Sequence, residues 1–574
     1  MKKKFQGIFL YLIIMLILPF GVFIPDAGAA AAEKVQYGGT LTYLDRVPTV
    51  NPMTWDIEDW NWKHGYDTGF YMEHLLMGDL QKGPRGTKKF NFQSNAWIPP
   101  DVMRGELLEK WEVKKNPLQL IFKLRKGVMW QDKPGVMKAR EFVADDVVYA
   151  ITRLKNSKKA IPLYMDFIGK METPDKYTLV INMPEWKVDW WYSMGWGYYD
   201  AIQAPEQEKA PGGPKKWENA CGTGPYMLTD YKESHSQTYT KNPKYWDTET
   251  IGGKKYKLPF TDKVVMQIIK DEATQIASLR TGKIDLMLAM NWKYVDELKK
   301  SCPQLQWSRW LYTDNFTVAL RMDQKPFNDI RVRRAVNMAI NRQEIIKSFY
   351  GGNAELHTYP FPPSFTDVYT PVEKLPPAAR ELFTYNPEKA KKLLAEAGYP
   401  NGFTFKAQIS NAGQTGLDLG AMVVAYLAKI GVTLVLDPMD YPSYLSRMTK
   451  KNHSEGYFFS NDQGTPFAGI RKNFLTGQTW NPHMMSDPYV DKTWQDAVEN
   501  PKLTDKQALA IMKKLSVYIT EQAPCIILPT AYTYTAWWPW VKNYHGELRV
   551  GAHRAAPIVG RIWIDQELKK KMGY

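Results

Sequence analysis

Residues 263–286 read KVVMQIIKDEATQIASLRTGKIDL, and this stretch predicts a strand, a helix and a second strand in close succession. The apolar run that follows Lys263 is typical of a buried strand. Asp271 favours the amino-terminal cap of a helix, and Gly282 is typical of the position just after a helix ends. Strand–helix–strand units build α/β folds. The sequence therefore predicts an α/β protein.

A second stretch, residues 326–346, predicts two consecutive helices. Asp329 can cap the first helix, and Asn341 with Glu344 three residues later forms a capping box for the second. Apolar residues spaced three and four positions apart mark the buried face of the first helix. Three basic residues lie off that face and are expected to point into solvent: Arg331, Arg333 and Arg334.

Length and composition indicate a globular protein of several domains. The chain has 574 residues, of which 44% are hydrophobic and 24% charged. At roughly 150 residues per domain, this length predicts about three or four domains with a large core. The 21 tryptophans and the 13% aromatic content exceed ordinary usage. Part of this excess must be core, and the rest favours an aromatic-lined binding surface.

The amino terminus is typical of a secretion signal. Lys2, Lys3 and Lys4 precede an apolar stretch at residues 8–20, and small residues suited to cleavage follow at residues 27–31. We therefore predict a cleavable signal peptide over residues 1–30, with an uncleaved anchor helix as the alternative. No later stretch approaches the ~20 apolar residues of a membrane span. We expect a mature protein that is soluble and periplasmic.

The cysteine count leaves the redox state open. The three cysteines are Cys221, Cys302 and Cys525, so one disulfide could form in an oxidising compartment with one thiol left over. The sequence does not say which pair would form, and the spacing fits no zinc motif. No cysteine lies near the expected cleavage site, so we predict that the protein has no lipid anchor.

The formal net charge of +15 raises the question of an anionic partner. A basic protein can bind nucleic acid or an acidic membrane surface. The basic residues are dispersed along the chain, and the only runs of three are residues 2–4 and 569–571. We therefore expect a solvated basic surface and no nucleic-acid partner.

Motifs of catalysis are missing from the sequence. The eight histidines form no H-E-x-x-H pair, and there is no G-x-S-x-G elbow and no phosphate-binding loop that ends in Lys-Ser or Lys-Thr. The G-x-G after Cys221 predicts a turn that enters a strand, and Asp145 with Asp146 predicts the first turn of a helix. We predict no catalytic residues, no metal site and no cofactor. An enzyme whose site is assembled from distant residues remains the alternative.

Four segments together resemble one protein family. They are KWEVKKNPLQLIFKLRKGVMW with EFVADDVVYAITRL, CGTGPYMLTDYKESHSQTYTKNPKYWD, PFNDIRVRRAVNMAINRQEI and NPEKAKKLLAEAGYPNGF. In this order they resemble the extracytoplasmic solute-binding proteins of peptide-type ABC importers, the oligopeptide- and dipeptide-binding group of family 5. The resemblance runs from about Gly38 to about Val541.

The resemblance implies a two-lobed periplasmic-binding-protein fold, α/β in class, with a hinge and an inserted third α/β region. Lobe one would comprise residues 33–53, 218–312 and 540–574. The inserted accessory region would be 54–217, and lobe two would be 313–539. The loop expected at residues 206–217 falls at one of these boundaries. A ligand that contacts both lobes would bind the closed form more tightly than the open form, and this difference in affinity would stabilise the closed form. The closed form would then deliver the solute to a membrane permease.

The segment GYFFSNDQG, residues 456–464, departs from the family pattern. In peptide-binding members an aspartate at the end of this aromatic strand pairs with the α-amino group of the ligand. An ungapped match places Ser460 at that position, and Asp462 follows two residues later. Either a shift of one or two residues lets Asp462 pair with the α-amino group, or the ligand has no α-amino group. An oligopeptide or, alternatively, an oligosaccharide is therefore the expected solute.

Aromatic residues could supply flat platforms for such a ligand. Trp60 and Trp62 alternate in a polar stretch, Trp196 belongs to the cluster PEWKVDWWYSMGWGYYD, and Tyr441 matches a position of a ligand-facing aromatic in the family. Ordinary core packing is the alternative for each. Trp537, Trp538 and Trp540 are expected to pack at the hinge. The predicted ligand-binding set is Trp60, Trp62, Trp196, Tyr441, Ser460, Asn461 and Asp462.

Overall fold

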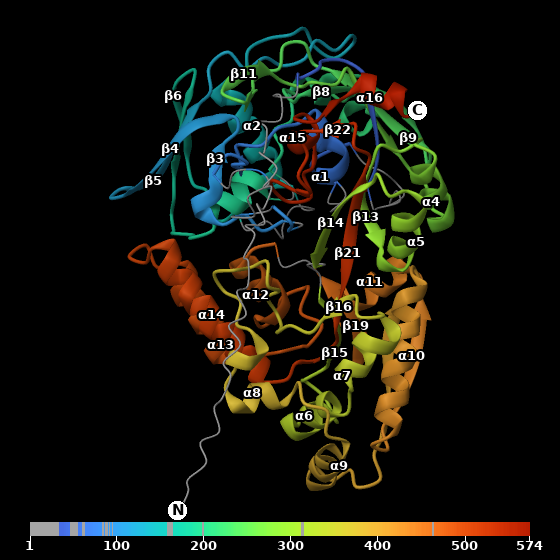
Figure 1. The fold of residues 1–574 in the computed structure, drawn as a ribbon. Helices are drawn as coiled ribbons and strands as arrows, with labels where there is room; N and C mark the ends of the chain where they lie inside the picture. Colours follow the sequence, from blue (N-terminus) through green and yellow to red (C-terminus); the bar gives the residue numbers. More distant parts are fainter. Residues whose placement is uncertain are drawn as a thin grey trace, which may run out of the picture.

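The computed structural model describes residues 34–45, 55–59, 64–82, 85, 90, 92–94, 96–157, 165–197, 200–311, 315–461 and 464–574. The predicted signal peptide, Trp60, Trp62 and Asp462 lie outside these residues, as does the side chain of Asn461. Among the residues that the structure describes, no helix combines the length and the apolar character that a membrane crossing requires. Figure 1 shows two bodies stacked one above the other, which we call lobe one (upper) and lobe two (lower).

Lobe one is built on a large mixed sheet whose strands follow the order β14-β21-β13-β1-β12-β9-β8. The strand–helix–strand prediction is confirmed in this sheet. β12 (Lys263–Gln267), α4 (Glu272–Arg280) and β13 (Leu286–Asn291) follow one another, and β1 (Thr40–Leu44) lies between the two strands and parallel to both. Asp271 caps α4 by accepting a hydrogen bond from the backbone N of Thr274 at 2.8 Å. Gly282 follows the helix with φ +68°, a conformation that glycine adopts without strain.

The remaining strands of the large sheet and its helical cover come from distant parts of the chain. They are β8 (Tyr226–Lys232), β9 (Ser236–Lys241), β14 (Gln306–Leu311), β21 (Thr530–Trp537) and α5 (Val295–Ser301). The hairpin of β10 (Thr248–Ile251) and β11 (Lys254–Lys257) projects beside them. The carboxyl-terminal segment adds β22 (Val541–Lys542), α15 (Ala556–Val559), β23 (Trp563–Ile564) and α16 (Gln566–Lys571).

A smaller antiparallel sheet, order β4-β5-β7-β6, forms the inserted region beside the large sheet. Its strands are β4 (Leu108–Lys115), β5 (Leu118–Leu124), β6 (Met171–Asp175) and β7 (Thr178–Asn182), and α2 (Ala144–Asn156) packs on it. Two short strands, β2 (Leu76–Gly78) and β3 (Met103–Gly105), and α1 (His64–Asp67) lie nearby. The loop expected at residues 206–217 is instead a series of short helical turns, α3 (Glu206–Lys209) and single turns at residues 213–215 and 217–219. Glycine and proline separate these turns from one another, which explains why the segment read as a loop.

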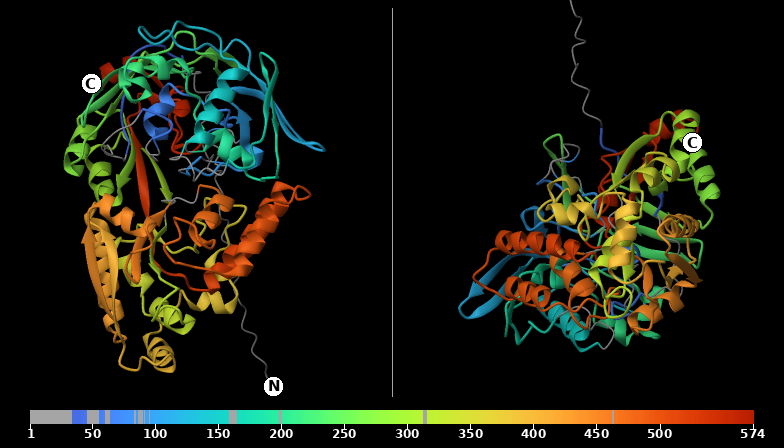
Figure 2. Two further views of the ribbon diagram at one scale, coloured as in Figure 1. Left: turned by 180° about the vertical axis from the view of Figure 1, so that it is seen from behind. Right: turned by 90° about the horizontal axis from the view of Figure 1, so that it is seen from below.

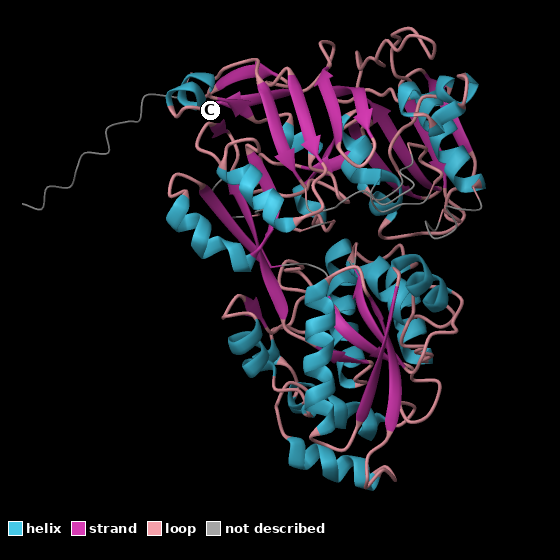
Figure 3. Cartoon of the chain, turned by 90° about the vertical axis from the view of Figure 1, so that its right-hand side faces the viewer, coloured by secondary structure: helices cyan, strands magenta, loops and turns pink. Residues whose placement is uncertain are grey.

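Lobe two is built on a five-stranded sheet of order β18-β17-β19-β15-β20, and Figure 3 shows helices on both of its faces. The strands are β15 (Asn315–Leu320), β17 (Thr404–Ser410), β18 (Thr433–Met439), β19 (Gly456–Asn461) and β20 (Cys525–Ile527). The helices α6 (Ile330–Met338), α9 (Pro387–Glu396) and α10 (Gln414–Ala428) share one buried core with the sheet. The predicted caps Asp329, Asn341 and Asn386 each accept a hydrogen bond from a backbone N in the first turn that follows.

Two connections carry the chain between the lobes near β21. β14 of the large sheet is followed by β15 of lobe two, and β20 of lobe two is followed by β21. β21 pairs through Thr530 and Ala531 with β16 (Ala354–Glu355), and further along with β13 and β14. The sequence had assigned residues 313–539 to lobe two, whereas the ladder of β21 joins most of this strand to the sheet of lobe one. A strand that pairs with both lobes is the natural place for a hinge.

Arg333 corrects the expectation that all three arginines of α6 point into solvent. Its side chain is 4% exposed, and its guanidinium donates to the carbonyl oxygens of Phe327 at 2.7 Å and Gln522 at 3.0 Å. Burial lowers the pKa of Arg333 to about 10. The sequence misses this because the acceptor on Gln522 comes from a helix nearly two hundred residues away.

Candidate functional site

The carboxyl ends of the strands of lobe two face lobe one. β17 runs parallel to both β18 and β19, so these three strands end at the same edge of the sheet. β20 has the same direction, because β15 is antiparallel to both β19 and β20, and β20 leaves this edge to become β21. In open α/β sheets, ligands bind outside the carboxyl ends of the strands. This edge is therefore the candidate site.

The aromatic strand that ends in a polar tip is confirmed as β19, which occupies the centre of the sheet. Tyr457, Phe458 and Phe459 are buried, and the next residue, Ser460, is exposed at the carboxyl end. Ser460 lies opposite Phe316 of β15 in the ladder, and the backbone of Asn461 lies opposite Asn315. The structure thus places Ser460 at the edge where the sequence predicted a ligand contact.

Tyr441 reaches the same edge from the neighbouring strand. It begins α11 (Tyr441–Thr449) directly after β18, and Asp440 caps this helix through the backbone N of Ser443. The Tyr441 ring is 38% exposed and stacks on Tyr444 with ring centres 6.1 Å apart. Tyr444 in turn stacks on Tyr457 of β19 at 4.3 Å. Two buried tyrosines therefore connect the exposed ring to the first half of β19.

The inserted region of lobe one contacts lobe two at Gly464, four residues beyond Ser460 in the sequence. A Cβ atom added to Gly464 would lie 2.7 Å from the hydroxyl of Tyr192, so a glycine is required at this close approach. Gly464 also has φ +66°. Thr465 then caps α12 (Pro466–Phe474) by accepting from the backbone N of Ala468 at 3.0 Å. Burial raises the pKa of the neighbouring Asp189, whereas Arg471 and the Thr465 hydroxyl stabilise its ionised form.

Further contacts join the inserted region to the end of α13 (Pro488–Val498). Lys187 is buried and forms an ion pair with Glu499, Nζ to Oε1 at 2.7 Å. The backbone N of Val188 donates to the carbonyl oxygen of Val498 at 3.0 Å. We name the whole contact the inter-lobe clasp; it consists of Lys187, Val188, Asp189 and Tyr192 on one side and Gly464, Thr465, Val498 and Glu499 on the other. Figure 2 shows α13 and α14 (Asp505–Glu521) of lobe two reaching toward the inserted region.

Several of the tryptophans considered as ligand platforms or as hinge residues are buried in the core. Trp196 is 0% exposed, and its indole N–H donates to the sulfur of Met103 at 3.1 Å. Trp190 and Trp191 are buried as well. Trp538 and Trp540 stack with ring centres 4.8 Å apart and donate to the carbonyl of Leu279 and the carboxylate of Asp285. In this structure these rings offer a ligand no surface.

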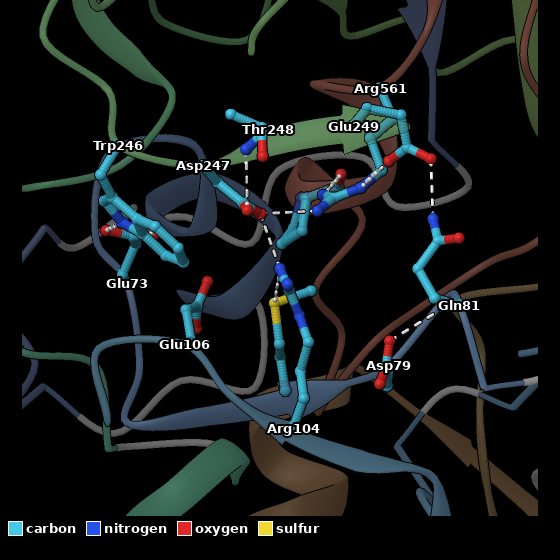
Figure 4. Close-up of polar contacts among 12 residues, drawn as sticks. Glu73, Asp79, Gln81, Arg104, Glu106, Trp246, Asp247, Thr248, Glu249 and Arg561 are labelled. Carbon is cyan, nitrogen blue, oxygen red and sulfur yellow. Dashed lines mark hydrogen bonds and ion pairs between the residues drawn. The ribbon is translucent and has the colours of Figure 1, made fainter. Parts of the chain in front are cut away.

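A buried ionic cluster lies inside lobe one (Figure 4). Arg104 and Arg561 both contact one carboxylate oxygen of Asp247 at 2.6 Å, and Arg561 also pairs with Glu249 at 2.7 Å. Burial opposes ionisation of Asp247, yet the two arginines hold its pKa at about 2. The cluster joins β3, the segment before β10 and the carboxyl-terminal segment. Its charges are satisfied within the protein, so it acts as an ionic core.

Glu73 lies beside this cluster and has a different protonation behaviour. Its carboxyl group accepts from the indole N–H of Trp246 at 3.0 Å and from the hydroxyl of Tyr245 at 3.1 Å. The neighbouring Glu106 forms a bidentate salt bridge with Arg554, whose Nη1 and Nη2 lie 2.7 and 2.8 Å from the two carboxylate oxygens. Burial, together with the negative charge of Glu106, raises the pKa of Glu73 to about 8. Glu73 is therefore mostly protonated at neutral pH.

Within the described part of the chain, no group of three or more His, Cys, Asp or Glu side chains is arranged to hold a metal ion. Cys221, Cys302 and Cys525 are all free thiols and all buried. Burial raises the pKa of Cys221 to about 12, which keeps this thiol protonated and unreactive.

Sequence reasoning found one side of the site and missed the other. It singled out Ser460 and Tyr441 through the family resemblance, and it predicted the strand that ends at Ser460 from its aromatic run. It missed Asp189, Tyr192 and Lys187, which stand inside an aromatic run that read as core. The available signal was the polar residues within that run, since a charge amid buried aromatic residues needs a partner.

Two hinged α/β lobes, with a polar strand end of one facing the other, define a two-lobed binding protein. Residues 102–466 match the family described as bacterial extracellular solute-binding proteins, family 5, middle region. The chain therefore belongs to the family 5 solute-binding proteins, as its sequence segments predicted. Similar proteins include the heme-binding protein A of Haemophilus influenzae, 28% identical over 76% of this chain and 81% of the relative. The dipeptide-binding protein of Escherichia coli is 26% identical over 76% of this chain and 83% of the relative.

Solved structures share the whole fold. The periplasmic binding protein DppA of Helicobacter pylori, in complex with the peptide STSA, has a TM-score of 0.73 at 22% identity and covers 92% of this chain and 99% of its own. The binding protein AgaA of A. tumefacien R10, in complex with agropinic acid, has a TM-score of 0.71 at 19% identity, covering 92% and 99%. At this identity the likeness establishes the two-lobed fold, and the ligands of these proteins differ.

Proposed function

We propose that this chain is the substrate-binding component of an ABC importer, which captures a peptide-like solute in the periplasm and delivers it to a membrane permease by hinge closure. The observation that carries the proposal is the exposed polar end of β19, at the strand edge that faces the inter-lobe clasp, in a chain of family 5. A ligand held there touches both lobes and can favour the closed form. The role is one of binding, without a chemical step.

The ligand site that we propose combines the tip of β19 with aromatic neighbours. Ser460, Asn461 and Asp462 would supply polar contacts, Tyr441 a stacking face, and Trp60 and Trp62 further platforms. Trp196 would contribute only if opening of the lobes uncovers it. A peptide laid along the strand edge would be held by main-chain hydrogen bonds, and a carboxylate at Asp462 would select a free α-amino group.

An oligosaccharide or another non-peptide solute is the second candidate. Ser460 stands where peptide-binding members carry the amine-binding aspartate, and a neutral hydroxyl suits a neutral ligand. Relatives and structural neighbours of this chain include proteins named for heme or bound to agropinic acid. This range of ligands is compatible with a change of ligand class on the same scaffold.

The amino terminus and the lobe boundaries complete the proposal. We propose that residues 1–30 are a cleavable signal peptide, that no lipid anchor follows, and that residues 54–217 are the inserted region. We further propose that the chain crosses between the lobes at the β14–β15 and β20–β21 connections. Mass spectrometry of the secreted protein tests the cleavage site, since an uncleaved chain would retain residues 1–30.

A thermal-shift screen on the unfolded and refolded mature protein tests the ligand class. The panel pairs di- to pentapeptides with free and acetylated amino termini against oligosaccharides. A ligand that binds only the native state raises the melting temperature by mass action. Shifts with free but not acetylated peptides support peptide capture through a carboxylate. Shifts with oligosaccharides alone overturn it, and turnover of a ligand would indicate an enzyme.

Two substitutions separate the candidates. Asp462→Asn should weaken a free peptide by more than about 100-fold if this carboxylate pairs with the amine, because breaking a buried ion pair costs about 3–5 kcal/mol. Asp496→Asn, an exposed change on α13, is the matched control. Trp60→Ala should weaken an oligosaccharide by about 1 kcal/mol or more. If Asp462→Asn leaves the peptide affinity unchanged, Asp462 does not pair with the amine. If Trp60→Ala leaves the oligosaccharide affinity unchanged, Trp60 does not stack on the sugar.

A further inference from the structure

The proposed solute-binding function does not explain the net charge of +15. Part of this charge comes from lysines near one end of lobe one. Three exposed lysines, Lys254, Lys255 and Lys257, lie on β11 of the projecting hairpin. The turn of this hairpin, Gly252 and Gly253, meets no other part of the protein. Figure 1 places β11 at the end of lobe one that lies away from lobe two.

Three more lysines from the adjoining sheet extend this surface: Lys241, Lys244 and Lys263. Lys257 Nζ lies 3.5 Å from the carbonyl of Pro243, next to Lys244. Lys263 pairs in the ladder with Thr240, the neighbour of Lys241. None of the six lysines forms an ion pair with any residue that the structure describes. The nearby acidic residues Asp247 and Glu249 are occupied by Arg104 and Arg561. The exposed Asp262, next to Lys263, carries a negative charge that acts on Lys241, so the six lysines outnumber this carboxylate.

Two tyrosines stand among these lysines. Tyr37 is 45% exposed, donates from its hydroxyl to the carbonyl of Lys257 at 2.9 Å, and has Lys241 Nζ 4.8 Å from its ring centre. Tyr256 has Lys254 Nζ 5.2 Å from its ring centre. Both rings pack against buried Phe260, which holds them in place. We name the six lysines with Tyr37 and Tyr256 the lysine–tyrosine patch.

We propose that the lysine–tyrosine patch binds the anionic lipid surface of a membrane. Lysines close to a negatively charged leaflet are attracted to it, and tyrosine is favoured at the boundary between headgroups and water. Long lysine side chains can place their charge among phosphates while their methylene groups lie on the aromatic rings. This combination of charge and amphipathic rings fits a lipid interface.

The position of the patch favours lipid over a permease. A permease that distinguishes the closed from the open form must sense the arrangement of both lobes, whereas the patch lies on lobe one alone and away from lobe two.

Flotation with lipid vesicles tests the proposal on the mature protein. Vesicles of phosphatidylcholine with about one third phosphatidylglycerol should carry the protein upward at low salt, and phosphatidylcholine alone should not. Binding should be lost between about 0.05 M and 0.5 M salt, because the Debye length falls severalfold. Without flotation on anionic vesicles at low salt, the proposal is wrong.

A pair of charge-reversal variants provides the control. Changing Lys254, Lys255 and Lys257 together to Glu should reduce vesicle partitioning more than about tenfold. Changing Lys502, Lys506 and Lys514 of lobe two to Glu alters the net charge equally and should reduce it less than about twofold. Both variants should keep the melting temperature and the ligand response of the parent. Equal losses, or binding only to membranes that contain the permease, would overturn the proposal.

Discussion

Arg333 is a charged side chain held in the interior by backbone carbonyl groups. Its helix position reads as exposed, but α6 packs so that the guanidinium reaches the carbonyls of Phe327 and Gln522. No carboxylate is needed, because carbonyl dipoles from two separate segments satisfy the charge. Arg333 therefore joins the start of α6 to the end of α14.

Arg333→Met should destabilise the protein by about 2–4 kcal/mol, because two buried carbonyl oxygens lose charged hydrogen-bond donors. Arg331→Met on the same helix removes an exposed arginine and should change the free energy of unfolding much less. Denaturant unfolding measures both. If both variants lose the same free energy of unfolding, the buried hydrogen bonds of Arg333 do not stabilise the protein more than an exposed arginine does.

Glu73 should make stability depend on pH. Its folded pKa of about 8 lies above the ordinary value of 4.5. Between these values the native state holds a proton that the unfolded chain has released, so this group lowers the free energy of unfolding as pH rises from about 5 to 8. Glu73→Gln cannot release that proton and should show a flatter decline over this range.

The measurement is the free energy of unfolding of parent and variant at several pH values. The exposed Glu172 provides the control, since Glu172→Gln should leave the pH dependence of the parent unchanged. A Glu73→Gln profile that is parallel to that of the parent would mean that Glu73 titrates near its ordinary pKa in the folded protein.

At the scale of elements, the inter-lobe clasp connects the inserted region to α12 and α13. Lys187 and Glu499 form an ion pair that is partly shielded from water, and the backbone contact between Val188 and Val498 lies next to it. These contacts involve none of the residues proposed to bind the ligand. The clasp can therefore influence closure independently of the ligand.

Lys187→Met should weaken the binding of every ligand by about tenfold, because the loss of ~1–2 kcal/mol falls on the closed form. The factor should be equal for different ligands, since the residue shifts only the equilibrium between open and closed forms. Lys492→Met breaks an exposed pair with Asp496 on α13 and is the matched control. Calorimetric titration measures the affinities, and a factor that varies with the ligand would instead indicate direct contact.

At the scale of the whole molecule, the buried thiols report global unfolding. Cys221 and Cys302 lie in lobe one and Cys525 lies in lobe two, all three buried. A thiol reagent should label none of them rapidly in the native protein and all three after denaturation. A bound ligand should slow labelling by stabilising the native state. A denatured, unreduced protein that takes up a single label would contain a disulfide and contradict the structure.

Part of the candidate site could be read from sequence, and part could not. The strand at residues 456–461 and its polar end were predicted because an aromatic run followed by polar residues is a signal within a few residues of the chain. The helix that begins at Tyr441 was not predicted. The clasp was not predicted, because its two sides, around residues 190 and 465, are far apart in sequence. The same separation hid the ionic pairs of Asp247 with Arg104 and Arg561.

The sequence by itself determined the α/β class, the strand–helix–strand unit at residues 263–286, the helix caps and the membership of family 5. These features follow from local signals and from segments kept in a recognisable order. Only the tertiary structure decided that Arg333 is buried, that β21 pairs with both lobes, that Trp196 lies in the core and that Lys241 and Lys254 each lie over a tyrosine ring that packs on Phe260. Each of these depends on which distant segments meet, and local propensity does not contain that information.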